Sequence, residues 1–131
     1  MSRQTEISDL EIDDPISTEE EERERVFQEI SFALIAQKRL MKRFYYFCEE
    51  YVNFEFDESG INFDEASELK RKAEKIRDLI FHNIESMLAY NLENINSNVE
   101  QSIITMNFKT EENTYNITIE VLNNSFNLEV L

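Results

Sequence analysis

Residues 102–131 read SIITMNFKTEENTYNITIEVLNNSFNLEVL, and apolar residues occupy alternate positions in three runs of this stretch. A period of two places apolar side chains on one face of a strand and polar side chains on the other. The breaks at residues 111–113 and 123–125 are short and polar, as hairpin turns are. We therefore predict strands over about 102–109, 114–122 and 125–131, joined as an antiparallel meander with one apolar face.

The residues before this stretch repeat with the longer period of a helix. Nine positions spaced alternately by four and three hold eight apolar residues, as expected of a helix that lies on a core. These positions are Val26, Ile30, Ala33, Gln37, Leu40, Phe44, Phe47, Tyr51 and Phe54. The spacing predicts one helix over about 15–55. Because Val52, Phe54 and Phe56 also alternate as in a strand, residues 51–57 are consistent with a helix end or a strand.

A second helical stripe runs from Ala66 to Ile95 and predicts a helix over about 63–95. Gly60 lies in the short connection between the two helices, which makes them antiparallel neighbours. The predicted fold class is α+β: a long antiparallel helical hairpin followed by a three-stranded antiparallel β-meander packed on it. We interpret residues 1–14 as a flexible acidic arm and residues 15–131 as a single domain.

Composition limits the classes of function. The 131 residues include 28 acids and 13 bases, giving a net charge of −15. This charge argues against direct binding of nucleic acid or of an anionic membrane. No apolar run is long enough to span a membrane, and the single Cys48 cannot form an internal disulfide. We therefore expect a cytoplasmic protein, or one in a host-cell cytoplasm if a phage or mobile element encodes it.

Acidic residues gather in two regions. Residues 1–29 carry eleven acids and three bases, and residues 49–68 carry eight acids and no base. Dense carboxylates on a helix suit a basic partner protein, and the pattern predicts contacts there. The expected contact residues are Glu19, Glu20, Glu21, Glu22, Glu24, Glu49, Glu50, Asp57 and Glu58.

Basic residues concentrate between these regions. Residues 30–48 hold four bases and no acid, and residues 69–78 hold five bases and two acids. A hairpin about Gly60 brings the two groups together. The result is either a solvated face with local salt bridges or a positive patch for an acidic or phosphate-bearing partner. The candidate patch comprises Lys38, Arg39, Lys42, Arg43, Lys75 and Arg77.

Catalytic and metal-binding patterns are sparse. His82 is the only histidine, and Asp78 and Glu85 are its helical neighbours with acidic side chains. Residues 55–60 resemble the start of a calcium loop, but Ala66 occupies the position that requires a bidentate Glu. We therefore expect no enzyme activity, no metal and no cofactor, with His82 as the starting point of any enzymatic alternative.

The sequence favours a non-enzymatic protein-binding module, an inhibitor or adaptor that engages a basic partner protein, a class that includes nucleic-acid-binding proteins. In size, acidity and lack of catalytic groups the chain is similar to DNA-mimic inhibitors that phages and mobile elements direct against restriction, repair or CRISPR enzymes. This similarity is one of composition, since no family motif carries it. The alternative is a self-associating structural or chaperone-like assembly protein, with a homodimer through Phe32, Ile35, Tyr46 or the last strand.

Overall fold

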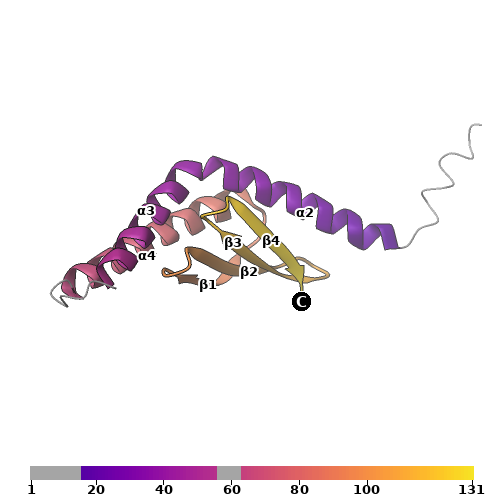
Figure 1. Cartoon of the computed structure of the whole chain (residues 1–131). Coiled ribbons are helices and arrows are strands. Elements are labelled where there is room, and N and C mark those ends of the chain that lie inside the picture. Colours follow the sequence, from indigo (N-terminus) through magenta and orange to yellow (C-terminus); the bar gives the residue numbers. More distant parts are fainter. Residues whose placement is uncertain (1–15, 56–62) are drawn as a thin grey trace, which may run out of the picture.

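In the described residues, 16–55 and 63–131, three helices cover one face of a four-stranded antiparallel sheet (Figure 1). The structure is a computed structural model. Its helices are α2 (Ile16–Ala36), α3 (Lys38–Glu55) and α4 (Phe63–Met87). Its strands are β1 (Leu92–Asn98), β2 (Ile103–Lys109), β3 (Thr114–Glu120) and β4 (Ser125–Val130). The predicted α+β class is confirmed.

The sheet has the order β1-β2-β3-β4, and each strand pairs with the next along the chain. Met106 pairs with Ile117, and Ile117 pairs with Leu128, so one apolar row crosses three strands. Alternate residues of β2 and β3 are buried beneath the helices. The period of two in the sequence therefore marks the inner face of the sheet.

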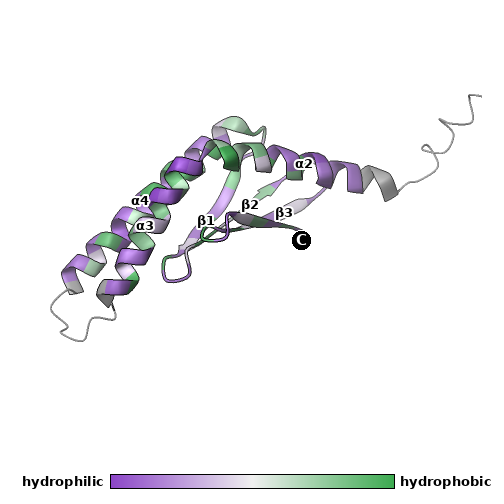
Figure 2. Ribbon diagram, turned by 45° about the horizontal axis from the view of Figure 1, so that its top comes forward, coloured by the Kyte–Doolittle hydropathy of each residue, from purple (hydrophilic) through white to green (hydrophobic). Residues whose placement is uncertain are grey.

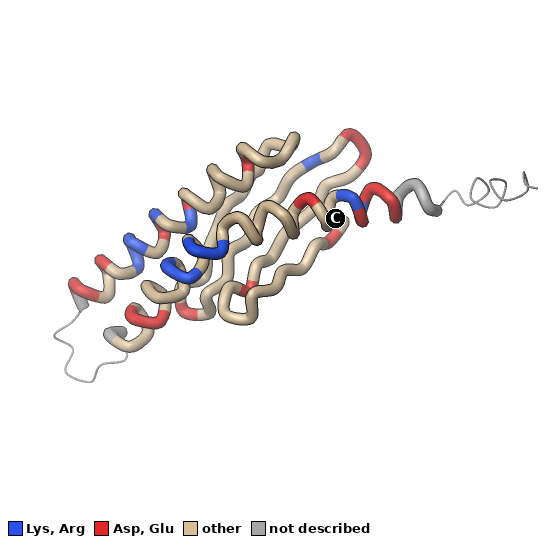
Figure 3. Tube along the Cα trace, turned by 90° about the horizontal axis from the view of Figure 1, so that it is seen from above, with Lys and Arg blue, Asp and Glu red and all other residues tan. Residues whose placement is uncertain are grey.

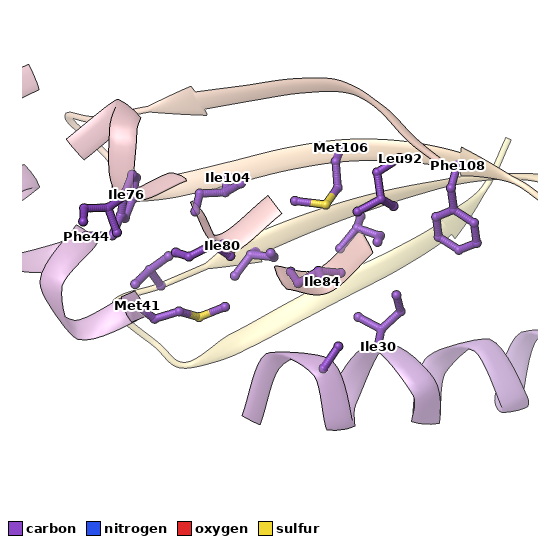
Figure 4. Close-up of a cluster of buried hydrophobic side chains, with 14 of the residues drawn as sticks. Ile30, Met41, Phe44, Ile76, Ile80, Ile84, Leu92, Ile104, Met106 and Phe108 are labelled. Atoms are coloured by element: carbon purple, nitrogen blue, oxygen red, sulfur yellow. The ribbon is translucent and has the colours of Figure 1, made fainter. Parts of the chain in front are cut away.

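The core lies between the helical layer and this inner face (Figure 4). Ile80 and Ile84 of α4 point toward Ile104 and Met106 of the sheet, and each is buried. Burying a side chain of this size contributes roughly 1.5–3 kcal/mol relative to leaving it in water. The helices alternate short hydrophobic and hydrophilic blocks along their length, as amphipathic helices on a core must (Figure 2).

Helices α3 and α4 are antiparallel. Helix α2 precedes α3 in the chain and lies at an angle to it, across the sheet (Figure 1). The Lys72 ammonium lies 5.9 Å from the centre of the Phe47 ring, which joins α4 to α3. At the other side of the layer, Phe27 of α2 stacks on Phe126 of β4 with ring centres 4.7 Å apart. The three helices therefore share one core with the sheet.

The prediction of a single helix over 15–55 is wrong at Gln37. The chain turns there, so α2 ends at Ala36 and α3 begins at Lys38. Gln37 donates its backbone N–H to the carbonyl of Leu34, a tighter spacing than in an α-helix. Its buried side chain accepts a hydrogen bond from Asn83 of α4 at 2.8 Å. The only polar member of the apolar row thus marks the break.

The predicted helix over 63–95 is also too long, because α4 ends at Met87 and residues 92–98 form β1. The sheet therefore has four strands and not three. A bulge between Glu93 and Asn96 shifts the register of β1, and Asn94 takes a positive φ of 52°. The bulge inserts one extra residue into β1, so Leu92 and Ile95 both face the core. They are three positions apart, a spacing that is typical of a helix and not of a regular strand.

The three strands expected from the alternating pattern are β2, β3 and β4, each within two residues of its predicted bounds. Residues 51–57 were consistent with a helix end or a strand, and the described part, residues 51–55, is helical and ends α3. Residues 1–15 and 56–62, with the predicted arm and the turn at Gly60, lie outside the described residues. None of the described helices combines the length and apolar character that a membrane span needs.

Candidate partner-binding surfaces

The carboxylate of Glu22 joins the first part of α2 to the turn between β2 and β3. Its Oε1 atom accepts hydrogen bonds from Tyr115 Oη at 2.7 Å, Asn113 Nδ2 at 2.9 Å and Thr110 Oγ1 at 3.3 Å. These donors, Asn113 first and Tyr115 next, lower the pKa of Glu22 below its ordinary value. Glu22 was expected to contact a partner, and the Oε1 atom of its carboxylate already accepts three hydrogen bonds within the chain.

Two further contacts hold the same part of α2. Arg23 donates from Nη2 to the backbone carbonyl of Leu128 in β4 at 2.9 Å. Within the turn, Thr110 Oγ1 accepts the backbone N–H of Asn113 at 3.0 Å and of Glu112 at 3.2 Å. The helix and the turn are therefore fixed to each other and to the sheet.

This anchoring brings acidic residues from two segments about ninety residues apart to one end of the molecule (Figure 3). We name this group the acidic end. It consists of Glu20, Glu21 and Glu24 of α2 and of Glu111 and Glu112 of the β2–β3 turn, and all five side chains are exposed to solvent. The acidic run in the sequence predicted contacts at Glu20, Glu21 and Glu24, but Glu111 and Glu112 were not among the predicted contact residues.

Other predicted acidic contacts lie elsewhere. Glu49 and Glu50 are near the end of α3, at the opposite end of the helical layer from the acidic end (Figures 1 and 3). Glu49 is exposed and its Oε2 accepts a hydrogen bond from Tyr45 Oη at 3.4 Å, whereas Glu50 is half-buried. Asp57 and Glu58 lie outside the described residues, and so does the side chain of Glu19. The two acidic regions therefore do not form one continuous surface.

Basic residues of α3 and α4 occupy the middle of the helical layer (Figure 3). Lys38, Arg39, Lys42, Arg43 and Lys75 are exposed, and within the described residues none of them forms an ion pair. Together with Lys70 and Lys72 they make a group that we name the basic band.

Arg77 does not belong to this exposed group. Its guanidinium donates to Asp78 Oδ1 and to Ser97 Oγ of β1, each at 3.0 Å, and its side chain is largely buried. Arg77 therefore links α4 to the edge strand.

The two acidic neighbours of His82 on α4 have other hydrogen-bond partners in the structure. His82 is exposed on α4, and the centre of its ring lies 5.1 Å from the centre of the Phe81 ring. Asp78 is bound to Arg77, and Glu85 accepts the backbone N–H of Leu92 at 3.0 Å. Among the described residues there is no group of three or more side chains suited to hold a metal ion.

The one thiol lies in the core. Cys48 is buried, and this burial raises its pKa to about 11, with a smaller opposing effect from a hydrogen bond with Ser102. A thiol with such a pKa is protonated near neutral pH and therefore a poor nucleophile. Cys48 packs as a small apolar residue of α3.

Comparison of the chain with protein-family models, curated proteins and solved structures gives no match.

Proposed function

We propose that this chain is a non-enzymatic protein-binding module, an inhibitor or adaptor that binds a basic partner protein through the acidic end. The observation that carries the proposal is the Glu22 network. It holds α2 against the β2–β3 turn, so that neighbouring carboxylates keep a defined arrangement. A preorganised charged surface loses less conformational entropy on binding than a flexible one.

The chemistry of the acidic end defines the expected partner. Closely spaced carboxylates complement a surface rich in Lys and Arg, and such complementarity mainly sets specificity and association rate. Proteins that bind duplex DNA carry such Lys- and Arg-rich surfaces, since DNA has about one negative charge per 1.7 Å of its axis. The proposal therefore includes the version in which the acidic end imitates DNA. It also includes a cytoplasmic site of action, a reducing compartment that suits the free thiol of Cys48.

The test compares two variants with the same change in net charge. Glu20→Gln/Glu21→Gln/Glu24→Gln neutralises part of the acidic end. Glu93→Gln/Glu100→Gln/Glu129→Gln neutralises three exposed acids of the sheet and its turns. Each tagged protein is incubated with lysate of the cell in which the chain acts, at 50 and 300 mM NaCl. Retained proteins are then quantified by mass spectrometry.

We expect retained basic proteins that are lost at 300 mM NaCl, lost with the first variant and kept with the second. Added duplex DNA should displace them if the DNA-mimic version is correct. Equal retention by both variants, or binding that is insensitive to salt, would contradict the proposal. Circular dichroism spectra of both variants should match the unmodified chain, which separates lost binding from lost folding.

Exposed apolar side chains favour a second candidate function, self-association as a structural or chaperone-like assembly protein. Phe32 and Ile35 of α2 are each 70% exposed, and Tyr46 of α3 is 55% exposed. β4 is an edge strand, so its outer backbone groups suit pairing with another chain. Light scattering over a hundredfold range of concentration tests this candidate: a constant monomer mass would contradict it, and a rising mass that Phe32→Ser/Ile35→Ser suppresses would support it.

A further inference from the structure

A groove lies between the α2–α3 junction and the turn that connects β3 to β4, two parts that face each other in Figure 1. It consists of two cavities of about 280 and 320 Å³ that share Lys38, Met41 and Asn124. We name it the elbow groove. Its other apolar lining residues include Leu34, Ile35, Tyr45, Val121, Leu122 and Phe126.

The groove leaves large apolar side chains in water. Ile35 is 70% exposed at one side and Leu122 is 62% exposed at the other. Apolar side chains that remain exposed around a concave surface are typical of binding sites. Each cavity is at or below the lower end of the range for small-molecule sites, and the two adjoin. This shape suits successive apolar side chains of one extended ligand better than a bulky cofactor.

The charges around the groove restrict its ligand further. Lys38 and Lys42 line it, and no acidic residue does so in the described part of the chain. Neither lysine forms an ion pair with a described residue. In a chain with a net charge of −15, this is a local positive surface beside an apolar one. The complementary ligand carries carboxylates next to apolar side chains.

We propose that the elbow groove binds a short acidic segment of another protein chain, with two or three apolar side chains in the two cavities and carboxylates beside Lys38 and Lys42. A nucleic acid would satisfy the lysines but leave the apolar lining uncovered. The proposal concerns a surface separate from the acidic end, so each can fail without the other.

A synthetic peptide tests the chemistry directly. The peptide Thr-Glu-Ile-Ser-Asp-Leu-Glu-Ile-Asp-Asp, the sequence of residues 5–14, combines five acids with three apolar residues. It is labelled with a fluorophore, and its anisotropy is followed as full-length protein is added. We expect saturable binding that weakens at least tenfold with Lys38→Glu/Lys42→Glu and also with Leu122→Asp. Replacing every acid of the peptide by Lys should abolish binding.

Matched controls separate the groove from general electrostatics. Arg39→Glu/Arg43→Glu makes the same change in charge on the same helix, but neither residue lines the groove. This variant should retain binding within about threefold. Absence of peptide binding, or equal losses for the two double variants, would overturn the proposal. Thermal unfolding of each variant shows whether it is folded under the conditions of the titration.

A last measurement examines whether a second copy of the chain supplies the segment. Sedimentation of the full chain is compared with that of Ile7→Ser/Leu10→Ser/Ile12→Ser. A dimer that both this variant and Lys38→Glu/Lys42→Glu dissociate supports the proposal and names the second copy as the partner. A dimer that the groove variants leave intact, together with failed peptide binding, rejects an acidic segment as the ligand.

Discussion

At the scale of single residues, Glu22 differs from the acids around it because three donors surround one of its oxygens. Glu20, Glu21 and Glu24 extend into solvent, whereas Glu22 lies on the side of α2 that faces the β2–β3 turn. Hydrogen bonds to a charged group are stronger than those between neutral groups. The charge of Glu22 therefore stabilises the fold, and this stabilisation holds the neighbouring acids in place.

Replacing Glu22 by Gln should reduce the free energy of unfolding by about 1–2 kcal/mol at pH 7, since the charge-assisted bonds become neutral ones and the site is partly exposed. The folded-state pKa of Glu22 lies below the unfolded value of about 4.5. Its contribution is therefore fully present above pH 4.5 and is lost as pH falls through the folded-state pKa.

The difference between the two proteins should accordingly shrink below pH 4.5, as urea unfolding at pH 3.5, 5 and 7 would measure. Glu21→Gln provides the control, because the Glu21 side chain is exposed one position away on the same helix. Its effect should stay within about 0.5 kcal/mol at every pH. An equal loss for the two variants would show that the Glu22 network contributes no specific stability.

At the scale of elements, the sequence pattern predicts those strands and helices whose period is uninterrupted. β2 and β3 alternate regularly against the core and were found within two residues. β1 was mistaken for helix because its bulge places Leu92 and Ile95 three positions apart on the inner face. The asparagines around them are poor helix formers, and this was the available signal against a helix.

The bulge of β1 makes a specific demand on position 94. Asn94 has a φ of 52°, a region that Asn and Gly tolerate and that β-branched residues avoid. Asn94→Val should lower the free energy of unfolding by about 1–2 kcal/mol, and Asn94→Gly should change it by only a few tenths. Asn127→Val, on the exposed side of β4 with ordinary backbone angles, should be neutral in urea unfolding. Similar losses at positions 94 and 127 would contradict this account.

The junction of α2 and α3 depends on one buried amide. Gln37 is 5% exposed, and its Oε1 and Nε2 atoms bind Asn83 and the sulfur of Met87. Gln37→Ala removes these bonds and leaves a cavity, so we expect a loss of about 2 kcal/mol in the free energy of unfolding. The control is Gln28→Ala, an exposed position of α2, with an expected change within about 0.5 kcal/mol. Urea unfolding measures both.

At the scale of the whole molecule, charge is arranged in three zones along the helical layer (Figure 3). The acidic end and the acids at the far ends of α3 and α4 lie on either side of the basic band. Local sequence predicts the composition of each zone, but only the fold brings Glu111 and Glu112 beside α2. The elbow groove was likewise beyond sequence reasoning, because the break at Gln37 and the β3–β4 turn form it together.

This arrangement predicts the effect of salt on stability. The chain has an excess of fifteen negative charges. The described residues form two ion pairs, and in each pair at least one side chain is exposed to solvent. Repulsion between like charges therefore outweighs the attraction of exposed pairs. Raising NaCl from 10 to 300 mM should raise the midpoint of thermal unfolding by several degrees, as scanning calorimetry would measure. A falling midpoint would show that attractive pairs dominate.

Salt therefore has opposite expected effects on folding and on partner binding, and this opposition separates the two roles of the acids. Glu20→Gln/Glu21→Gln/Glu24→Gln removes repulsion at the acidic end, so its thermal midpoint at 10 mM NaCl should equal or exceed that of the unmodified chain. Its salt response should be smaller, because fewer charges remain to be screened. If this variant unfolds at a lower temperature than Glu93→Gln/Glu100→Gln/Glu129→Gln, the acidic end stabilises the fold, and its exposure to a partner no longer explains its charge.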